Sequence, residues 1–238
     1  MTLIHLDVET TGLDEAARIV QLAYKNAETG EVVNEFFNPQ MPISFGAMSI
    51  HHVTNEMVAD KPAFDGSKEK DTLISLLKDN ILVAHNAKFD IGVLETEGVE
   101  VPKFIDTLKV AQHLIKSESH KLQYLRYSLA LDVEGPAHDA LGDIQVLESL
   151  YSKLESLAME EFSLTKEEVI EKLLELTHLP VLLDTFAFGK HRGKSFGEVA
   201  ASDRGYLEWL YRSETQKTET EQDANLVHTL KHCLATWG

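Results

Sequence analysis

Residues 3–9 (LIHLDVE) most constrain what this chain can fold into, because two acids stand in a largely apolar, strand-forming run. Side chains alternate between the two faces of a strand, so Asp7 and Glu9 would share one face and Ile4, Leu6 and Val8 the other. The two carboxylates would then lie about 6–7 Å apart. One interpretation is a divalent cation held between them, since Mg²⁺ and Mn²⁺ prefer oxygen ligands. The alternative is an exposed edge strand with two solvated acids.

The charge of the chain limits the partners that it can bind. Its 238 residues carry 22 Lys and Arg against 39 Asp and Glu, a net charge of −17, which disfavours indiscriminate binding to a polyanion. Residues 179–238 hold seven basic and eight acidic side chains, so residues 1–178 hold 15 and 31. A nucleic acid would therefore need bound metal on the N-terminal side and a local basic patch elsewhere.

The same composition indicates a cytoplasmic protein. The single cysteine, Cys233, excludes an internal disulfide framework and fits a reducing compartment. The N-terminus has no signal-peptide pattern, and the longest uncharged run, residues 36–55, is interrupted by Pro39, Pro42 and Gly46. No membrane span is expected from such a run.

An α/β fold is predicted for the first part of the chain. Residues 18–27 and 32–38 read as strands around a turn, so that three antiparallel strands open the domain. From residue 81 onward, short apolar runs at 81–84 and 104–107 alternate with helical patterns, which predicts a mixed sheet with helices on its faces. The expected helices cover residues 65–79, 87–97 with Asn86 as N-cap, 108–115 and 122–129.

The longest helical pattern, residues 137–162, provides a second sign of a cation site. Its core stripe consists of leucines three or four residues apart: Leu147, Leu150, Leu154 and Leu157. Asp143 lies four residues before Leu147 and belongs to the same buried stripe. A carboxylate there is costly unless it is paired or bound to metal. His138, at the entrance to this helix, is either a structural histidine or part of the same site.

The last sixty residues differ in character. We expect an acidic, solvated helical connector at residues 163–180 after a first domain of residues 1–162, and then a small α+β appendage at 181–238. The appendage would open with a strand at 185–188 and continue with helices near 196–202, 204–213 and 226–234. Between the strand and the first helix, the glycine-hinged loop 189–194 carries three cations (Lys190, Arg192 and Lys194), which suits phosphate contact. A solvated turn is the alternative for this loop.

Together the acids form one candidate site. Asp7 and Glu9 at a strand end, Asp90 at a helix start and Asp143 on a buried stripe would repel one another strongly. Two divalent ions would relieve this repulsion, and such pairs stabilise the attacking and leaving oxygens of phosphoryl displacement. His138, with an ordinary pKa of about 6.5, could take a proton from an attacking water near neutral pH.

Three motifs in this order resemble those of the DEDDh exonuclease family: residues 6–13 (LDVETTGL), 85–90 (HNAKFD) and 138–143 (HDALGD). The resemblance implies a ribonuclease-H-like fold and stepwise 3′→5′ release of nucleoside monophosphates with two Mg²⁺ or Mn²⁺ ions. It assigns Asp7, Glu9 and Asp143 to the metals, Asp90 to the metals and their water, and His138 to the general base. The residues that it implies along the 3′-terminal nucleotide are Thr10, Gly12, Leu13, His51, Asn86 and Phe89.

The C-terminal part is similar to the tail of the exodeoxyribonuclease X group, on residues 185–194, 205–210 and 229–232, together with 57–62. This likeness implies DNA, single- or double-stranded, as the main substrate and a role in DNA repair. The alternatives are a polymerase-associated proofreading subunit, an RNA-trimming exonuclease, or a non-catalytic nucleic-acid-binding adaptor. A homo-oligomer and contacts with replication or repair proteins also stay open.

Overall fold

The structure is a computed structural model, and it describes residues 1–131, 140–218 and 221–236. The chain divides into two compact units, Met1–Thr177 and His178–Gly238, called here the N-terminal unit and the C-terminal unit. Each is described by itself. Within the described ranges, every helix is too short or too polar to cross a membrane.

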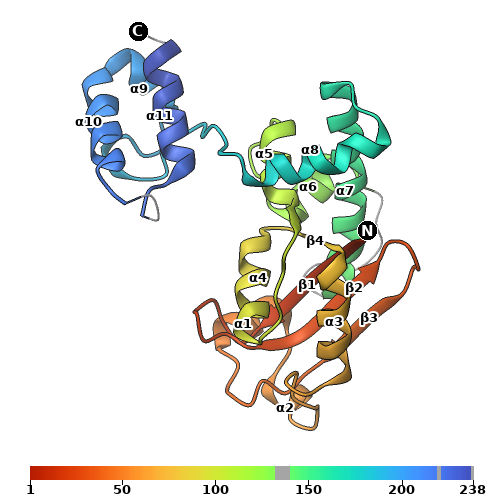
Figure 1. The fold of residues 1–238 in the computed structure, drawn as a ribbon. Coiled ribbons are helices and arrows are strands. Elements are labelled where there is room, and N and C mark those ends of the chain that lie inside the picture. Colours follow the sequence, from red (N-terminus) through yellow and green to blue (C-terminus); the bar gives the residue numbers. More distant parts are fainter. Residues whose placement is uncertain (132–139, 219–220, 237–238) are drawn as a thin grey trace. The chain divides into compact units, whose positions relative to one another are not determined.

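A five-stranded mixed sheet forms the centre of the N-terminal unit (Figure 1). Its strands are β1 (Leu3–Thr10), β2 (Ile19–Asn26), β3 (Val32–Phe36), β4 (Ile81–Ala84) and β5 (Phe104–Asp106). They lie in the order β3-β2-β1-β4-β5. The β1–β2 and β2–β3 pairs are antiparallel, whereas β4 runs parallel to β1 and to β5. The predicted mixed sheet with three antiparallel opening strands is confirmed.

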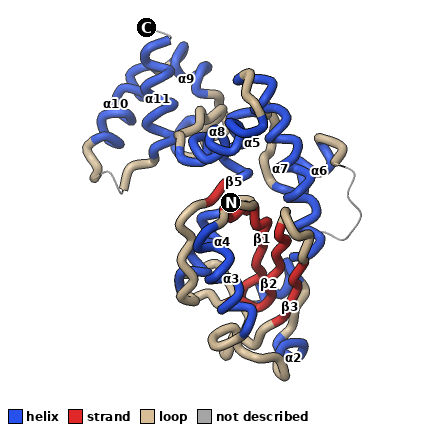
Figure 2. The backbone as a smooth tube through the Cα atoms, turned by 45° about the vertical axis from the view of Figure 1, so that its right-hand side comes forward, coloured by secondary structure: helices blue, strands red, loops and turns tan. Residues whose placement is uncertain are grey.

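Helices cover both faces of this sheet (Figure 2). The helices of the unit are α1 (Phe45–His51), α2 (Asn55–Val58), α3 (Lys68–Asp79), α4 (Ala87–Thr96), α5 (Thr107–Leu114), α6 (Leu122–Ser128), α7 (Ala140–Phe162) and α8 (Lys166–His178). Buried residues of α3 and α4 join those of β1 and β2 in one hydrophobic core. Buried residues of α5 to α8 join those of β4 and β5 in another, on the opposite face.

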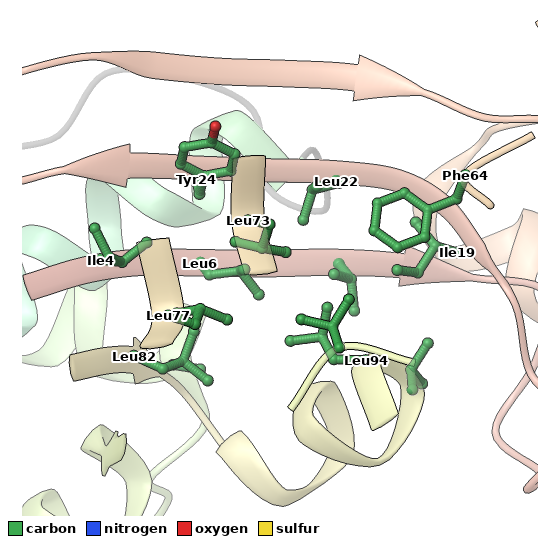
Figure 3. Close-up of a cluster of buried hydrophobic side chains, with 14 of the residues drawn as sticks. Ile4, Leu6, Ile19, Leu22, Tyr24, Phe64, Leu73, Leu77, Leu82 and Leu94 are labelled. Atoms are coloured by element: carbon green, nitrogen blue, oxygen red, sulfur yellow. The ribbon is translucent and has the colours of Figure 1, made fainter. Parts of the chain in front are cut away.

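Alternation along β1 directs its acids away from the first core. Ile4 and Leu6 are fully buried and face Leu73 and Leu77 of α3 (Figure 3). Burial of each such side chain contributes about 1.5–3 kcal/mol, so the register of β1 is strongly fixed. The other face of β1, which carries the acids, is the one on which α7 packs.

The segment expected to be a solvated connector differs in the structure. Helix α8 buries Val169, Leu173 and Leu176 in the second core. The hydroxyl of Thr177 also accepts a hydrogen bond from the backbone N–H of Asp106, at 3.0 Å. The acidic side chains of this helix lie on its outer side. Its apolar stripe packs against the second core, so the helix is part of the N-terminal unit rather than a solvated linker.

The C-terminal unit is helical, with a 3₁₀ turn η1 (Gly189–His191) before α9 (Phe196–Ser202), α10 (Arg204–Thr215) and α11 (Ala224–Thr236). The strand expected at residues 185–188 is only a single antiparallel bridge between Thr185 and Ser195. Phe186 exchanges backbone hydrogen bonds with the 193–194 segment, and the chain then turns into η1, which leaves no length for a strand. The prediction of a β-strand in the α+β appendage was therefore wrong in extent.

Candidate active site

The carboxylates of three predicted metal ligands converge beside β1. Asp7 and Glu9 extend from β1, and Asp143 lies in the first turn of α7. One carboxylate oxygen from each lies within 4.8 Å of the other two. Asp7 and Glu9 are half-buried and Asp143 is buried. Three hard oxygen donors at this spacing suit a divalent cation such as Mg²⁺ or Mn²⁺.

Helix α6 contributes a contact to this cluster that the sequence did not reveal. The side-chain amide of Gln123 donates a hydrogen bond to Oδ1 of Asp143. Arg126 in turn donates to the side-chain oxygen of Gln123, at 3.4 Å. A single glutamine on a short amphipathic helix carries no sequence signal, because only the packing of α6 against α7 brings it to the acid.

The predicted ligand Asp90 lies in the first turn of α4 and is buried, with 4% of its surface exposed. Burial, chiefly, together with the nearby charges of Asp106 and Glu9, raises the pKa of this carboxyl to about 8. Backbone groups of Asp90 itself and of Val8 act in the opposite direction. Asp90 therefore lies close to the end of β1, although it is not among the three acids within 4.8 Å.

Asp106 is a further buried acid that the sequence analysis missed. Its Oδ1 accepts hydrogen bonds from the backbone N–H groups of Asn86 and Leu108, both at 3.0 Å, so it caps α5 and anchors the start of α4. An Asp directly before a helix is a recognisable N-cap signal. Asn86 is the N-cap residue of α4, as expected, but it has a left-handed backbone (φ 66°) and its side chain makes no capping hydrogen bond.

A cavity of about 380 Å³ opens beside Glu9. Five of the six residues expected along the nucleotide line it: Thr10, Gly12, Leu13, His51 and Phe89. Leu13 is 84% exposed, so an apolar side chain stands at the cavity with little cover from the protein. The sixth residue, Asn86, lines a different cavity, together with His120 and Lys121.

His51 lines this cavity and is held by two hydrogen bonds to the backbone. Its Nδ1 accepts a hydrogen bond from the N–H of Val53 at 3.0 Å, so Nε2 carries the proton and donates to the carbonyl of Thr10 at 3.1 Å. Burial lowers the pKa of His51, which favours this neutral form. Because both ring nitrogens are engaged by backbone, His51 fixes the end of β1 against α1.

The remaining predicted residues lie elsewhere. His138, the expected general base, falls outside the described residues. In the C-terminal unit, Arg192 and Lys194 are exposed, whereas Lys190 forms an ion pair with Asp203 at 2.7 Å. The three cations of the expected phosphate loop are thus not equivalent, because one of them is already engaged.

Comparison with known proteins agrees with these observations. Residues 4–151 match the family model of exonucleases. Exodeoxyribonuclease 10 of Escherichia coli (strain K12) is 33% identical over 237 residues, covering 96% of this chain and 97% of that protein. The chain belongs to the exonuclease family. The expected family and ribonuclease-H-like architecture are thereby confirmed. The chain is therefore a nuclease, and its family implies the use of divalent metal.

Two further relatives cover parts of this exonuclease. DNA polymerase III subunit epsilon of Buchnera aphidicola is 31% identical over 169 residues, which is 62% of this chain and 70% of that protein. The solved structure of exonuclease X in complex with 5′ overhanging duplex DNA aligns with a TM-score of 0.57 and 31% identity, covering 74% of this chain and 99% of that one. In the C-terminal unit, residues 186–214 match the model of the exodeoxyribonuclease X-like C-terminal region.

Proposed function

We propose that this exonuclease is a metal-dependent 3′→5′ exodeoxyribonuclease that releases nucleoside 5′-monophosphates from single- or double-stranded DNA and acts in DNA repair. The observation that carries the proposal is the meeting of Asp7, Glu9 and Asp143 within 4.8 Å. Three carboxylates gathered this closely are poorly explained by packing alone, since like charges at short range destabilise a fold. They are well explained by a site for cations.

Two divalent ions, Mg²⁺ or Mn²⁺, would be held by these three acids and by the nearby Asp90. When bound, they would neutralise the acids and stabilise the attacking and leaving oxygens of an in-line phosphodiester displacement. The donor set fits such ions, because every ligand is a hard carboxylate oxygen.

The cavity beside Glu9 would hold the 3′-terminal nucleotide. Its volume of about 380 Å³ is within the usual range for a small-molecule site. Leu13 and Phe89 offer apolar surface to a base, while the wall formed by Thr10 and His51 is held in place by their mutual hydrogen bond. Because Glu9 itself lines the cavity, a nucleotide seated there would have the scissile phosphate beside the acids. His138 is proposed as the base that accepts the proton of the attacking water.

DNA is the favoured substrate. The relative exonuclease X was solved with duplex DNA, and the likeness to exodeoxyribonuclease 10 extends over both units. The second candidate, a proofreading subunit, is favoured by the likeness to DNA polymerase III subunit epsilon, but that likeness covers 62% of this chain. The match of residues 186–214 to an exodeoxyribonuclease X-like region supports the first candidate.

A degradation assay tests the proposal. Single-stranded DNA, duplex DNA and RNA of one sequence are labelled at either end and incubated with Mg²⁺, Mn²⁺ or EDTA. We expect a 3′ label to leave at once as a mononucleotide and a 5′ label to give a descending ladder, from DNA only when metal is present. Faster decay of RNA, immediate release of the 5′ label or hydrolysis in EDTA would contradict it. No hydrolysis at all, with DNA still bound, would favour the non-catalytic adaptor.

A further inference from the structure

The C-terminal unit carries a surface that the proposed active site does not use. It consists of Trp209 and Tyr206 on α10 and of Lys190 on the adjacent η1 turn, and we call it the aromatic surface. Trp209 is 57% exposed, and its ring lies 5.6 Å from that of Tyr206 with the planes tilted by 33°. Nζ of Lys190 lies 4.7 Å above the Tyr206 ring. A cation–π contact therefore covers Tyr206 and leaves the indole as the open aromatic face.

This arrangement is held by its neighbours. Asp203 accepts hydrogen bonds from Lys190 at 2.7 Å and from His191 at 2.9 Å, and it also caps the start of α10. The His191 ring packs at 4.8 Å against Tyr206, beneath the surface. Gly189 has φ +68°, and a Cβ there would lie 2.8 Å from the hydroxyl of Tyr206. The turn is thus fitted closely to Tyr206, which fixes the position of Lys190.

The charge next to the aromatic surface indicates what it binds. Arg192 and Lys194, on the loop that continues from η1, are exposed, and none of the ion pairs within the described ranges involves them. Residues 179–238 carry a net charge near −1, against −16 for the rest of the chain. Two exposed cations on the loop after η1 and an exposed indole on α10 match a ligand that has both phosphates and flat apolar rings.

We propose that the aromatic surface binds unpaired nucleotides of a DNA strand, with a base stacked on Trp209 and phosphates contacted by Arg192 and Lys194. The proposal rests on the proposed function, which supplies DNA as the substrate. Stacking on an indole is tolerant of sequence and requires the base to be out of a duplex, where its faces are covered. The surface would thus retain the single strand of a DNA end rather than select a sequence.

Tryptophan emission reports this binding directly. The chain has two tryptophans, so in the Trp237→Phe variant the emission comes from Trp209 alone. In EDTA, where hydrolysis is absent, we expect a thymidine 20-mer to quench this emission and a blunt-ended duplex with the same number of phosphates to leave it unchanged. Equal quenching by both DNAs would show a charge contact without stacking. No quenching by either DNA would show that DNA does not bind at this surface. Both results overturn the proposal.

Binding of a labelled 20-mer to full-length variants gives a second measure. Trp209→Ala should weaken binding at least about fivefold, the lower end for loss of a stacked base, while Trp209→Phe keeps most of the affinity. Arg192→Gln with Lys194→Gln should reduce the salt dependence, d log K/d log[salt], by about 1.4, since each contact with a single strand contributes roughly 0.7. The matched control Lys231→Gln removes an exposed cation of α11 and should change neither value.

The two proposals fail separately. If the wild-type chain degrades DNA but Trp209→Ala and the double variant bind the 20-mer normally, the aromatic surface has no role in DNA binding and this inference is wrong. If DNA is not hydrolysed under any metal condition but still quenches Trp209, the proposed nuclease function is wrong and the binding surface stands.

Discussion

The side-chain amide of Gln123 on α6 donates a hydrogen bond to the carboxylate of Asp143 on α7. This contact fixes one oxygen of a buried acid that meets Asp7 and Glu9 within 4.8 Å. Gln123 lies outside the three sequence motifs, so it would act on the site only through Asp143. We therefore expect it to be a positioning residue for the proposed metal ligands.

Gln123→Ala should therefore weaken metal binding more than DNA binding. Loss of a group that orients a metal ligand typically costs about 10–100-fold in metal affinity. Calorimetric titration with Mn²⁺ should show a dissociation constant larger by this factor, and half-maximal activity should need correspondingly more Mg²⁺. Gln216→Ala, an exposed glutamine at the end of α10, is the control. Unchanged metal affinity with a lower rate would contradict the positioning role.

Asp7→Asn should abolish hydrolysis without unfolding the chain. It removes one charge from a crowded cluster, so the metal-free variant should melt at or above the wild-type temperature. Metal that binds only the folded state stabilises by about 2.7 kcal/mol at a hundredfold excess over Kd, which for a chain of this size shifts Tm by several degrees. The wild type should show this shift in Mg²⁺ and the variant should not. Normal release of a 3′ label by the variant would show that the site has been assigned wrongly.

His138→Ala should lower turnover far more than DNA affinity, because a general base acts in the chemical step. The expected loss in kcat is roughly 10²–10⁴-fold. Single-turnover rates and binding of a labelled strand in EDTA separate the two effects. His232→Ala, an exposed histidine of α11, serves as control. Weaker binding with unchanged kcat would instead give His138 a binding role.

The parts of the site that the sequence predicted are those where local pattern decides position. Alternation along β1 aligned Asp7 with Glu9, and helical periodicity placed Asp143 on a buried stripe. Gln123 was missed because its role depends on the packing of α6 against α7, which a single sequence does not show. Asp106 carried an N-cap signal before α5 that was overlooked, whereas its hydrogen bond from the N–H of Asn86 depends on tertiary packing. The amphipathic pattern of α8 was present but was outweighed by its acidic composition, so its buried Val169 and Leu173 were read as part of a solvated linker.

The pairing of Lys190 with Asp203 illustrates the same limit. In the sequence, the three cations of the loop 189–194 form one group, but Asp203 lies nine residues beyond the loop and forms an ion pair with one of them. Only the fold distinguishes the engaged cation from the two open ones. This distinction moves the expected phosphate contacts to Arg192 and Lys194.

His5 should make the N-terminal unit sensitive to acid. It is 2% exposed, its ring nitrogens have no hydrogen-bond partner among the described residues, and burial lowers its pKa from 6.5 to about 4. Between these values the unfolded chain binds more protons than the folded one, so stability falls as the pH drops from 6.5 to 4. The loss from this residue is at most about 3 kcal/mol at pH 4. The denaturant midpoint of unfolding should depend less on pH over this range in His5→Phe than in the wild type, whereas His232→Phe should leave this dependence unchanged. If the midpoint of His5→Phe falls with pH in parallel with that of the wild type, the effect is disproved.

Gly189→Ala should destabilise the C-terminal unit for two separable reasons. A left-handed backbone costs an L-residue roughly 1–2 kcal/mol, and the new Cβ would lie 2.8 Å from the Tyr206 hydroxyl. Tyr206 cannot move away freely, since its ring contacts His191, Trp209 and Lys190. Gly193→Ala, at φ +85° with open space around it, carries only the backbone cost and is the matched control.

A double-mutant cycle isolates the steric part of that loss. Tyr206→Phe removes the hydroxyl, so Gly189→Ala should cost less in the Tyr206→Phe background than in the wild type, and about as much as Gly193→Ala does. Denaturant unfolding followed by the emission of Trp209, in the Trp237→Phe chain, reports on this unit. If the cost of Gly189→Ala is the same in both backgrounds, the turn does not rest on the hydroxyl, and Lys190 is held in place only by Asp203 and the Tyr206 ring.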